Sequence, residues 1–423
     1  MRLYSTLQRE LVELPPAPST IGMYVCGPTV YQRAHIGNAR PFVLFSWIRN
    51  WLRLSQYDVT YVHNITDIND SIYEAAPGAS AELAARATAW YLEDIRDLGL
   101  GMPDHVPKAS ETIDEIITMI ERLIRTDYAY AVAGDVYFRV ARHREYGQLS
   151  NQRPDEMEEQ EPNPLKVDPR DFALWKANKP GEDTWWDSPW GRGRPGWHIE
   201  CSAMAEKLLG PCYELHGAGL DIVFPHNENE LAQSRALGSE YARIWMHNGM
   251  LRFTGEKMSK SLGNVRTIRD ALERWGRETL LVFFATAKWS HPIDFSDETL
   301  RAAEARAESF REIFRRPSIP AGGGEWARYS AALEDDFNTP EALAVMHEWR
   351  DHELLRRALD VFGLASLAEL AEAPEEIVEL AERRKGARGA SDFEQADALR
   401  DEIEAAGWVV RDVSDGFQLV PKP

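Results

Sequence analysis

The stretch IGMYVCGPTVYQRAHIGNARP, residues 21–41, decides the fold. Its first residues, Ile21 to Val25, are mostly apolar and predict a strand, which leads into the turn Cys26-Gly27-Pro28. A helical pattern follows over roughly residues 39–54, and a β-rich run extends from Tyr57 to Val62. The order strand, loop, helix, strand predicts a right-handed parallel βαβ unit.

The same alternation resumes farther along the chain. We expect a helix from about residue 198, a strand near 212–216, a helix from 226 and a strand near 243–247. From about residue 267 onward, helical patterns dominate. The sequence therefore predicts an α/β fold with a parallel sheet, followed by mainly helical C-terminal domains.

The composition is that of a globular protein and argues against several other classes. Hydrophobic residues make up 44% and charged residues 27% of the 423, which disfavours a disordered or fibrous chain. No apolar run is long enough for a membrane span, and the N-terminus has no apolar signal segment. The three cysteines are too few for a disulfide framework, so we expect a cytoplasmic protein with no membrane partner. The net charge of −20 disfavours general nucleic-acid binding but permits a local basic groove.

The tetrapeptide His35-Ile36-Gly37-Asn38 comes shortly after the first strand and opens a helix. A helix N-terminus presents free N–H groups, which bind phosphates readily. Gly37 would let a nucleotide approach the backbone, and His35 could donate to phosphate oxygens. The alternative is a histidine that only caps a buried helix.

A second motif, Lys257-Met258-Ser259-Lys260-Ser261, lies between Gly255 and Gly263. Two lysines and two hydroxyls on a glycine-bounded loop suit the charge that develops when a triphosphate is displaced at its α-phosphorus. The alternative is a solvated basic loop. We predict that Lys257, Ser259 and Lys260 bind ATP.

Four residues with metal-ligating side chains form a possible tetrahedral set. His226 and Glu230 are four residues apart and would share a helix face. Cys26 and Cys201 each lie at the edge of a predicted α/β element, and two thiolates, an imidazole and a carboxylate suit zinc. The spacing alone does not decide this, because a buried cysteine often acts only as a small apolar residue.

HIGN and KMSKS resemble the two signatures of class I aminoacyl-tRNA synthetases. The text around them resembles the cysteinyl-tRNA synthetase family in MYVCGPTVYQRAHIGNARP, YVHNITDIND, SPWGRGRPGWHIECSAMA, FPHNENELAQS, WMHNGML and GEKMSKSLGN. The resemblance implies a Rossmann-type catalytic domain split by an insertion and followed by helical tRNA-binding domains. We expect a catalytic domain over 1–265 with an insertion at about 101–195, a connecting helical domain over 266–320, a shortened helical domain over 321–373 and a small anticodon-binding domain over 374–423.

The same resemblance assigns the site. It places the zinc ligands on Cys26, Cys201, His226 and Glu230, and leaves Cys212 structural. It implies that Trp197 and His216, with Cys26, contact a bound cysteine, and that Gly219 and Asp221 contact adenosine beside His35, Gly37 and Asn38. The alternative for these pocket residues is packing beneath the metal site.

The sequence departs from the family pattern at several positions. HIGN replaces the commoner HIGH, and the usual TD-D-DK run has Asn69 and Ser71 where a carboxylate and a lysine are expected. FPHHENE reads FPHNENE at Asn227, and HGGG reads HGAG at Ala218. The helical region after DDFNTPEALAV is short, which bears on tRNA docking more than on cysteine activation.

The resemblance implies a monomeric ligase that uses ATP, magnesium and zinc to join L-cysteine to tRNA(Cys). One alternative is a paralogue that passes activated cysteine to a small amine, as the mycothiol ligases do, and another is a non-catalytic binding protein. A basic cluster in the tail, Arg383 to Arg400, could contact the tRNA backbone or be a solvated charge run.

Overall fold

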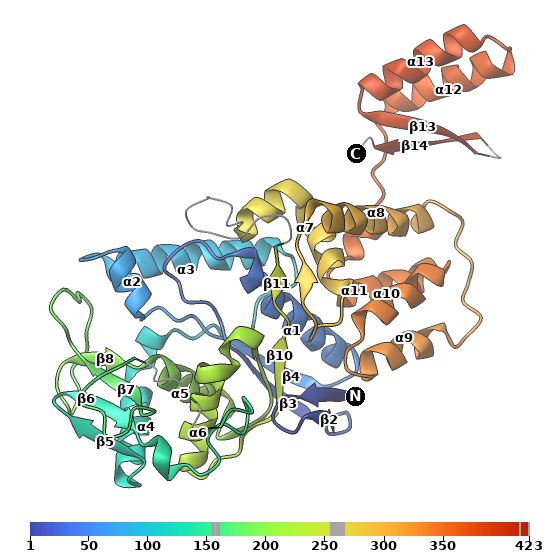
Figure 1. The fold of residues 1–423 in the computed structure, drawn as a ribbon. Helices are drawn as coiled ribbons and strands as arrows, with labels where there is room; N and C mark the ends of the chain where they lie inside the picture. The colour runs from blue at the N-terminus through green and yellow to red at the C-terminus, as the bar shows by residue number, and fades with distance from the viewer. Residues whose placement is uncertain (154–156, 158–160, 254–266, 414–415, 422–423) are drawn as a thin grey trace.

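A four-stranded parallel sheet lies at the centre of the N-terminal half, with the strand order β10-β9-β3-β4 (Figure 1). The computed structural model describes residues 1–153, 157, 161–253, 267–413 and 416–421. The strands are β3 (Thr20–Val25), β4 (Asp58–His63), β9 (Cys212–Gly219) and β10 (Tyr241–Asn248). The predicted α/β class and the first βαβ unit are confirmed.

Helices cover both faces of this sheet. Successive side chains of a strand point to opposite faces, so Met23 and Val25 pack on α1 (Ile36–Leu54), whereas Tyr24 packs with Met204 of α5 (Trp197–Leu209). The helix α6 (Glu228–Ala236) joins the α5 side. The strands thus read as nearly continuous apolar runs because both faces are buried.

A second sheet lies in sequence between β4 and α5. Its antiparallel strands are β5 (Ala129–Val132), β6 (Asp135–Phe138), β7 (Phe172–Ala177) and β8 (Gly193–Pro195). The helices that lead to it are α2 (Asp70–Ala75), α3 (Ser80–Asp97) and α4 (Ile113–Arg125). The sheet and α4 have a hydrophobic core of their own, and they form the lower left of Figure 1.

Helices dominate after residue 267, as predicted. They are α7 (Ile268–Ala285), α8 (Asp297–Phe314), α9 (Glu325–Glu334), α10 (Thr339–Glu348) and α11 (His352–Val361). Their apolar side chains share one core with α1, so this region packs against the helix that covers one face of the parallel sheet. Two short pairings complete the body, the hairpin β1 (Arg2–Ser5) with β2 (Glu10–Glu13), and the parallel pair β11 (Leu251–Arg252) with β12 (Ile293–Asp294).

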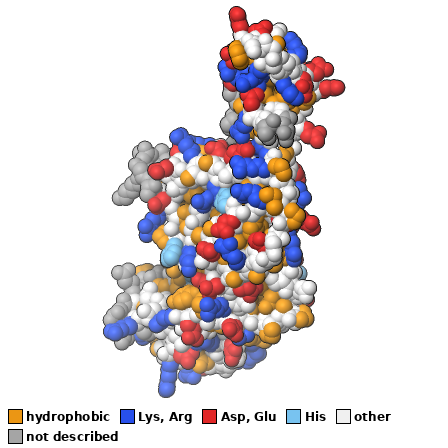
Figure 2. Space-filling model, turned by 90° about the vertical axis from the view of Figure 1, so that its right-hand side faces the viewer, with side chains coloured by type: hydrophobic (Ala, Val, Ile, Leu, Met, Phe, Trp, Pro, Cys, Tyr) orange, Lys and Arg blue, Asp and Glu red, His pale blue; other side chains and the backbone are white. Residues whose placement is uncertain are grey.

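The last residues form a small unit with a separate core. It consists of α12 (Glu375–Gly389), α13 (Phe393–Ala405) and the hairpin β13 (Trp408–Val413) with β14 (Gly416–Pro421). The unit projects from the body, and on the face seen in Figure 2 its basic and acidic side chains are interspersed. The predicted domain limits, including those of the small domain over 374–423, stay predictions.

Candidate active site and metal centre

A cleft of about 380 Å³ opens at the carboxyl ends of the parallel strands. Ligands of open α/β sheets bind at this edge, because loops from several strands meet there. The structure brings seven of the predicted site residues together in its lining: Cys26, His35, Gly37, Asn38, Trp197, Gly219 and Asp221. Residues from β3, α1, α5 and β9, far apart in sequence, therefore form a single site.

His35 caps the first turn of α1. The Gly37 N–H donates to His35 Nδ1 at 3.0 Å, and the His35 N–H donates to Asn38 Oδ1 at 3.1 Å. Burial lowers the pKa of His35, which favours the neutral imidazole. Because Nδ1 accepts the Gly37 N–H, Nε2 carries the proton. This Nε2 is buried and has no hydrogen-bond partner among the described residues, which leaves one donor for a ligand in the cleft.

Gly219 and Asp221 lie where β9 ends. Gly219 is the last residue of the strand, and a short 3₁₀ turn over Leu220–Ile222 follows it. A Cβ atom at Gly219 would lie 2.4 Å from Asp221 Oδ1, so a larger residue here would require this exposed carboxylate to turn away. Both residues line the same cleft as His35.

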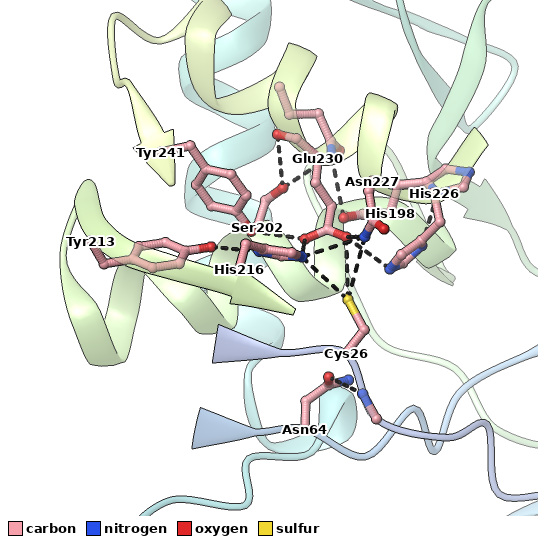
Figure 3. Close-up of polar contacts among 12 residues, drawn as sticks. Cys26, Asn64, His198, Ser202, Tyr213, His216, His226, Asn227, Glu230 and Tyr241 are labelled. Atoms are coloured by element: carbon pink, nitrogen blue, oxygen red, sulfur yellow. Dashed lines mark hydrogen bonds and ion pairs between the residues drawn. The ribbon is translucent and has the colours of Figure 1, made fainter. Parts of the chain in front are cut away.

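The predicted metal ligands converge beside the cleft, which Cys26 lines, and Figure 3 shows three of them, Cys26, His226 and Glu230, pointing toward one another. One donor atom from each of Cys26, Cys201, His226 and Glu230 lies within 4.8 Å of the other three, and all four residues are buried. His226 Nε2 lies 3.0 Å from Glu230 Oε1. Two sulfurs, one nitrogen and one oxygen at such separations could hold a tetrahedral metal ion.

The electrostatics of this cluster are those of a cation site. Burial lowers the pKa of His226, but Glu230 and Cys201 outweigh burial and raise it to about 10. Burial raises the pKa of Glu230, but His216 and His226 outweigh burial and lower it to about 2. Burial raises the pKa of Cys26 well above its usual value. Burial also raises the pKa of Cys201, but a hydrogen bond with Cys26 and the charge of His226 outweigh burial and lower it to about 7. A protonated His226 balances the buried Glu230 carboxylate, and a metal ion bound by the same donors would take the place of that proton.

The local backbone differs from the prediction at His226. We expected His226 and Glu230 on one regular helix, but α6 begins only at Glu228. Phe224 precedes a proline and is extended (φ −127°, ψ 134°), so residues 223–227 form a kinked turn. The imidazole still reaches the carboxylate because it lies one turn before it.

A second layer of polar side chains holds the ligands (Figure 3). Asn227 Nδ2 lies 2.8 Å from Glu230 Oε1 and 3.5 Å from Cys26 Sγ, while His247 Nε2 lies 3.1 Å from Asn227 Oδ1. Tyr241 donates its hydroxyl proton to Glu230 Oε2 at 2.9 Å. The sequence departure at Asn227 therefore supplies an amide that bridges two ligands and a histidine.

Two further histidines border the cluster. His216 Nε2 lies 3.4 Å from Cys26 Sγ, and His216 Nδ1 lies 2.8 Å from the Tyr213 hydroxyl oxygen. His198 Nδ1 lies 3.1 Å from His226 Nδ1, on the ring side opposite the metal donors. The ring of Trp197 lies 4.3 Å from that of His226 and forms the adjoining wall of the cleft. Sequence reasoning missed His198, Tyr241 and His247, and it noted Asn227 only as a departure from the family pattern. His198 and His247 lie inside strings that resemble the family, whereas Tyr241 lies outside all of them.

The KMSKS residues Lys257, Ser259 and Lys260 lie outside the described residues. The described positions on either side of them lie next to His35: the Phe253 ring is 5.1 Å from the imidazole, and Thr267 forms a β-bridge with His35. The Ile268 N–H also donates to the Ala34 carbonyl at 3.0 Å. Both described ends of the segment therefore adjoin the start of α1.

Two other sequence features have structural outcomes. Asn69 is the N-cap of α2, and its side chain accepts a hydrogen bond from the Ser71 N–H at 3.0 Å. The asparagine at this departure from the family pattern therefore stabilises the start of a helix. In the tail, Arg384 is buried and donates to both Asp412 oxygens, at 2.7 and 3.1 Å. The basic cluster is thus divided between a structural ion pair and exposed cations.

No described helix is long and apolar enough to cross a membrane. Comparison with known proteins gives two family matches. Residues 14–305 match the tRNA synthetases class I (C) catalytic domain, and residues 328–405 match the DALR domain.

The chain is similar over nearly its whole length to curated enzymes and, in fold, to a solved structure. It is 41% identical to the cysteine–tRNA ligase of Geobacillus thermodenitrificans and 42% identical to that of Azotobacter vinelandii, each over 98% of both chains. Methionyl-tRNA synthetase of Mycobacterium tuberculosis, solved in complex with methionyl-adenylate, shares the fold at a TM-score of 0.60 and 14% identity, over 82% of this chain and 88% of that one. The chain therefore belongs to the cysteine–tRNA ligase family of class I synthetases.

Proposed function

We propose that the chain joins L-cysteine to tRNA(Cys) in two steps, activation by ATP and transfer to the tRNA. In the first step, the cysteine carboxylate attacks the α-phosphorus of ATP and pyrophosphate leaves. In the second, a hydroxyl of the terminal adenosine attacks the carbonyl of cysteinyl-adenylate and AMP leaves. One observation carries this proposal: the helix N-terminus at His35 and the cluster of Cys26, Cys201, His226 and Glu230 adjoin the same cleft.

The residues of the chain position the substrates and stabilise the charge that develops on the phosphates, so no side-chain nucleophile is needed. The Nε2–H of His35 donates to phosphate oxygens, and the amide of Asn38 is a second donor. Gly219 leaves room for the adenosine, and Asp221 accepts hydrogen bonds from ribose hydroxyls. Lys257 and Lys260, with Ser259, stabilise the leaving pyrophosphate, with magnesium as its counter-ion.

Zinc is the metal that this donor set suits, held by Cys26, Cys201, His226 and Glu230. When bound, it offers the substrate thiol a soft ligand position that the serine hydroxyl fills poorly. His216 and Trp197 confine the substrate side chain beside it. A directional contact that the analogue cannot make discriminates far more strongly than one methylene group.

Transfer to tRNA is favoured over transfer to a small amine. The similarity to cysteine–tRNA ligases covers 98% of the chain, and it includes the DALR domain over 328–405. A small-amine ligase has no need for a domain that follows the catalytic core and contacts tRNA. We further propose that the enzyme is a monomer and acts in the cytoplasm.

The test compares two reactions of the purified enzyme. Cysteine-dependent exchange of pyrophosphate into ATP reports activation, and incorporation of labelled cysteine into tRNA(Cys) transcripts reports transfer. We expect both reactions, with serine at least 10³-fold poorer in exchange, a conservative bound from the discrimination of sites that bind a substrate group directly. Exchange without charging, together with ligation of a small amine, would replace the proposal by its alternative.

A further inference from the structure

A second cavity, of about 300 Å³, lies beside the cleft; we name it the α2–α3 cavity. One wall comes from α2 and α3 and the other from residues 184–186 next to β8, with residues 108–110 between them. Lining residues that matter here are Asp67, Asn69, Tyr73, Thr88, Lys108 and Trp186. None of these residues belongs to the metal cluster or to the lining of the cleft.

The walls are largely apolar and are fixed in place. The Tyr73 hydroxyl donates to the Thr184 carbonyl at 2.9 Å, which ties one wall to the other. The backbone of Trp186 pairs with Gly193 in both directions, at 2.8 and 3.0 Å. Two aromatic side chains on opposite walls therefore border a preformed space.

Polar groups remain available in this apolar setting. The Thr88 hydroxyl is buried and has no hydrogen-bond partner among the described residues. A buried hydroxyl without a partner is destabilising, so a ligand that bonded to it would be favoured. Asp67 accepts from the Ser110 N–H at 3.0 Å and from its hydroxyl at 2.5 Å, which leaves further lone pairs on the carboxylate.

The cavity adjoins the cleft through two segments. Thr66, next to Asp67, donates its N–H to the Pro28 carbonyl at 3.1 Å and accepts from the Val30 N–H at 3.2 Å. Pro28 and Thr29 line the cleft. On α3, Thr88 of the cavity lies one turn before Tyr91 of the cleft, roughly 4.5 Å along the helix axis. A chain of nucleotides could therefore occupy both spaces at once.

We propose that the α2–α3 cavity binds an unpaired nucleobase of the tRNA acceptor end while the terminal ribose lies in the cleft. A base offers a flat face to Tyr73 or Trp186 and a polar edge to Thr88, Asn69 and Asp67, which is how proteins bind single-stranded RNA. Lys108, which also pairs with Glu111 at 2.6 Å, lines the cavity and supplies a cation for an adjoining phosphate. The inference rests on the proposed function, because it needs tRNA as the acceptor.

A substitution that places a larger side chain in the α2–α3 cavity tests the proposal. Ala85 and Ala89 are both exposed on α3, but only Ala85 lines the cavity. Stacking of one base is worth about 1–3 kcal/mol, so Ala85→Met should lower kcat/KM for tRNA about 5- to 150-fold. Ala89→Met should charge normally, and both variants should keep exchange within about twofold of the wild type, because activation does not use the cavity. Trp186→Leu with Trp185→Leu as control gives a second pair, since Trp185 lies outside the lining.

Altered RNA identifies the ligand. In a series of tRNA transcripts, each unpaired acceptor position is made abasic in turn. Ala85→Met and the wild type should charge one of these transcripts at the same rate, namely the one that lacks the base bound in the cavity. Three results would show that the inference is wrong. Ala85→Met could charge tRNA as fast as Ala89→Met, or it could lower the rate of pyrophosphate exchange as much as the rate of charging. It could also stay equally impaired in charging on every abasic transcript. A wild-type enzyme that exchanges pyrophosphate but never charges tRNA would instead refute the proposed function.

Discussion

The Nε atom of Arg269 lies 3.0 Å from the buried carboxylate of Asp94, which also accepts from Arg33 at 3.0 Å. Arg33 precedes His35 by two residues, and Arg269 is the second residue of α7. Asp94 itself lies on α3 and is completely buried. One carboxylate therefore joins three segments around the start of α1, at the part of the cleft that Arg33 and His35 line.

Asp94→Asn should destabilise the protein by about 2–4 kcal/mol, because it leaves two partly buried guanidinium groups with an uncharged partner. Asp97→Asn is the matched control. Asp97 also pairs with Arg269, at 2.7 Å, but its side chain is 45% exposed, so the loss should stay below about 1 kcal/mol. Urea unfolding of both variants measures the difference, and equal losses would show that burial of Asp94 is unimportant.

The sequence predicted the parts of the fold whose pattern is local. The apolar run before Cys26 and the helical pattern after Gly37 correspond to β3 and α1 within a few residues. The pairing of His226 with Glu230 was also readable from their spacing, although Pro225 makes the backbone a kinked turn. These features depend on neighbours in the chain, so periodicity reveals them.

The rest of the site depends on packing between distant segments. Cys26 and Cys201 meet because α5 crosses β3, and spacing could not show that; the family resemblance supplied it. Tyr241 and His247 of β10 reach Glu230 and Asn227 because β10 packs beside α6, a contact that the strand pattern leaves open. Composition likewise could not separate the buried Arg384 from its exposed neighbours.

Cys201→Ser should lose the bound metal, whereas Cys212→Ser should keep it. Cys201 contributes one of the four converging donors, and Cys212 is exposed at the start of β9. Metal analysis of the purified proteins should give one zinc per chain for the wild type and for Cys212→Ser. Full zinc in Cys201→Ser, or its loss in Cys212→Ser, would contradict the assigned ligand set.

His198→Ala should weaken metal binding without abolishing it. The imidazole of His198 lies against Nδ1 of His226 and orients that ring toward the cluster. Loss of such an outer partner typically lowers metal affinity about 10- to 100-fold. Competition with a chelator, followed by metal release, measures this; an unchanged affinity would mean that Trp197 packing alone holds the ring.

Gly217→Ala should destabilise the sheet. A Cβ atom at this position of β9 would lie 2.2 Å from the ring of Phe45 on α1, and both residues are in the core. Overpacking of this kind costs about 1–3 kcal/mol. Gly386→Ala in α12 is the opposite case, because nothing lies within 4 Å of the added carbon, and the helix should gain about 0.5–1 kcal/mol. Thermal unfolding should move in opposite directions for the two variants.

The basic residues of α12 should divide into two functional groups. Arg384 is buried against Asp412, so Arg384→Ala should loosen the terminal unit, with faster amide exchange in β13 and β14. Arg383 and Lys385 are exposed on the same helix and are available to a tRNA backbone.

Arg383→Ala combined with Lys385→Ala should leave pyrophosphate exchange and amide exchange unchanged but weaken tRNA charging. Each lost phosphate contact should reduce the slope of log affinity against log salt by about 0.9, because fewer counterions are released. Charging measured from low to physiological salt tests this. If the double variant keeps the wild-type slope, the cations of α12 do not contact tRNA, and the cluster is a solvated helix face.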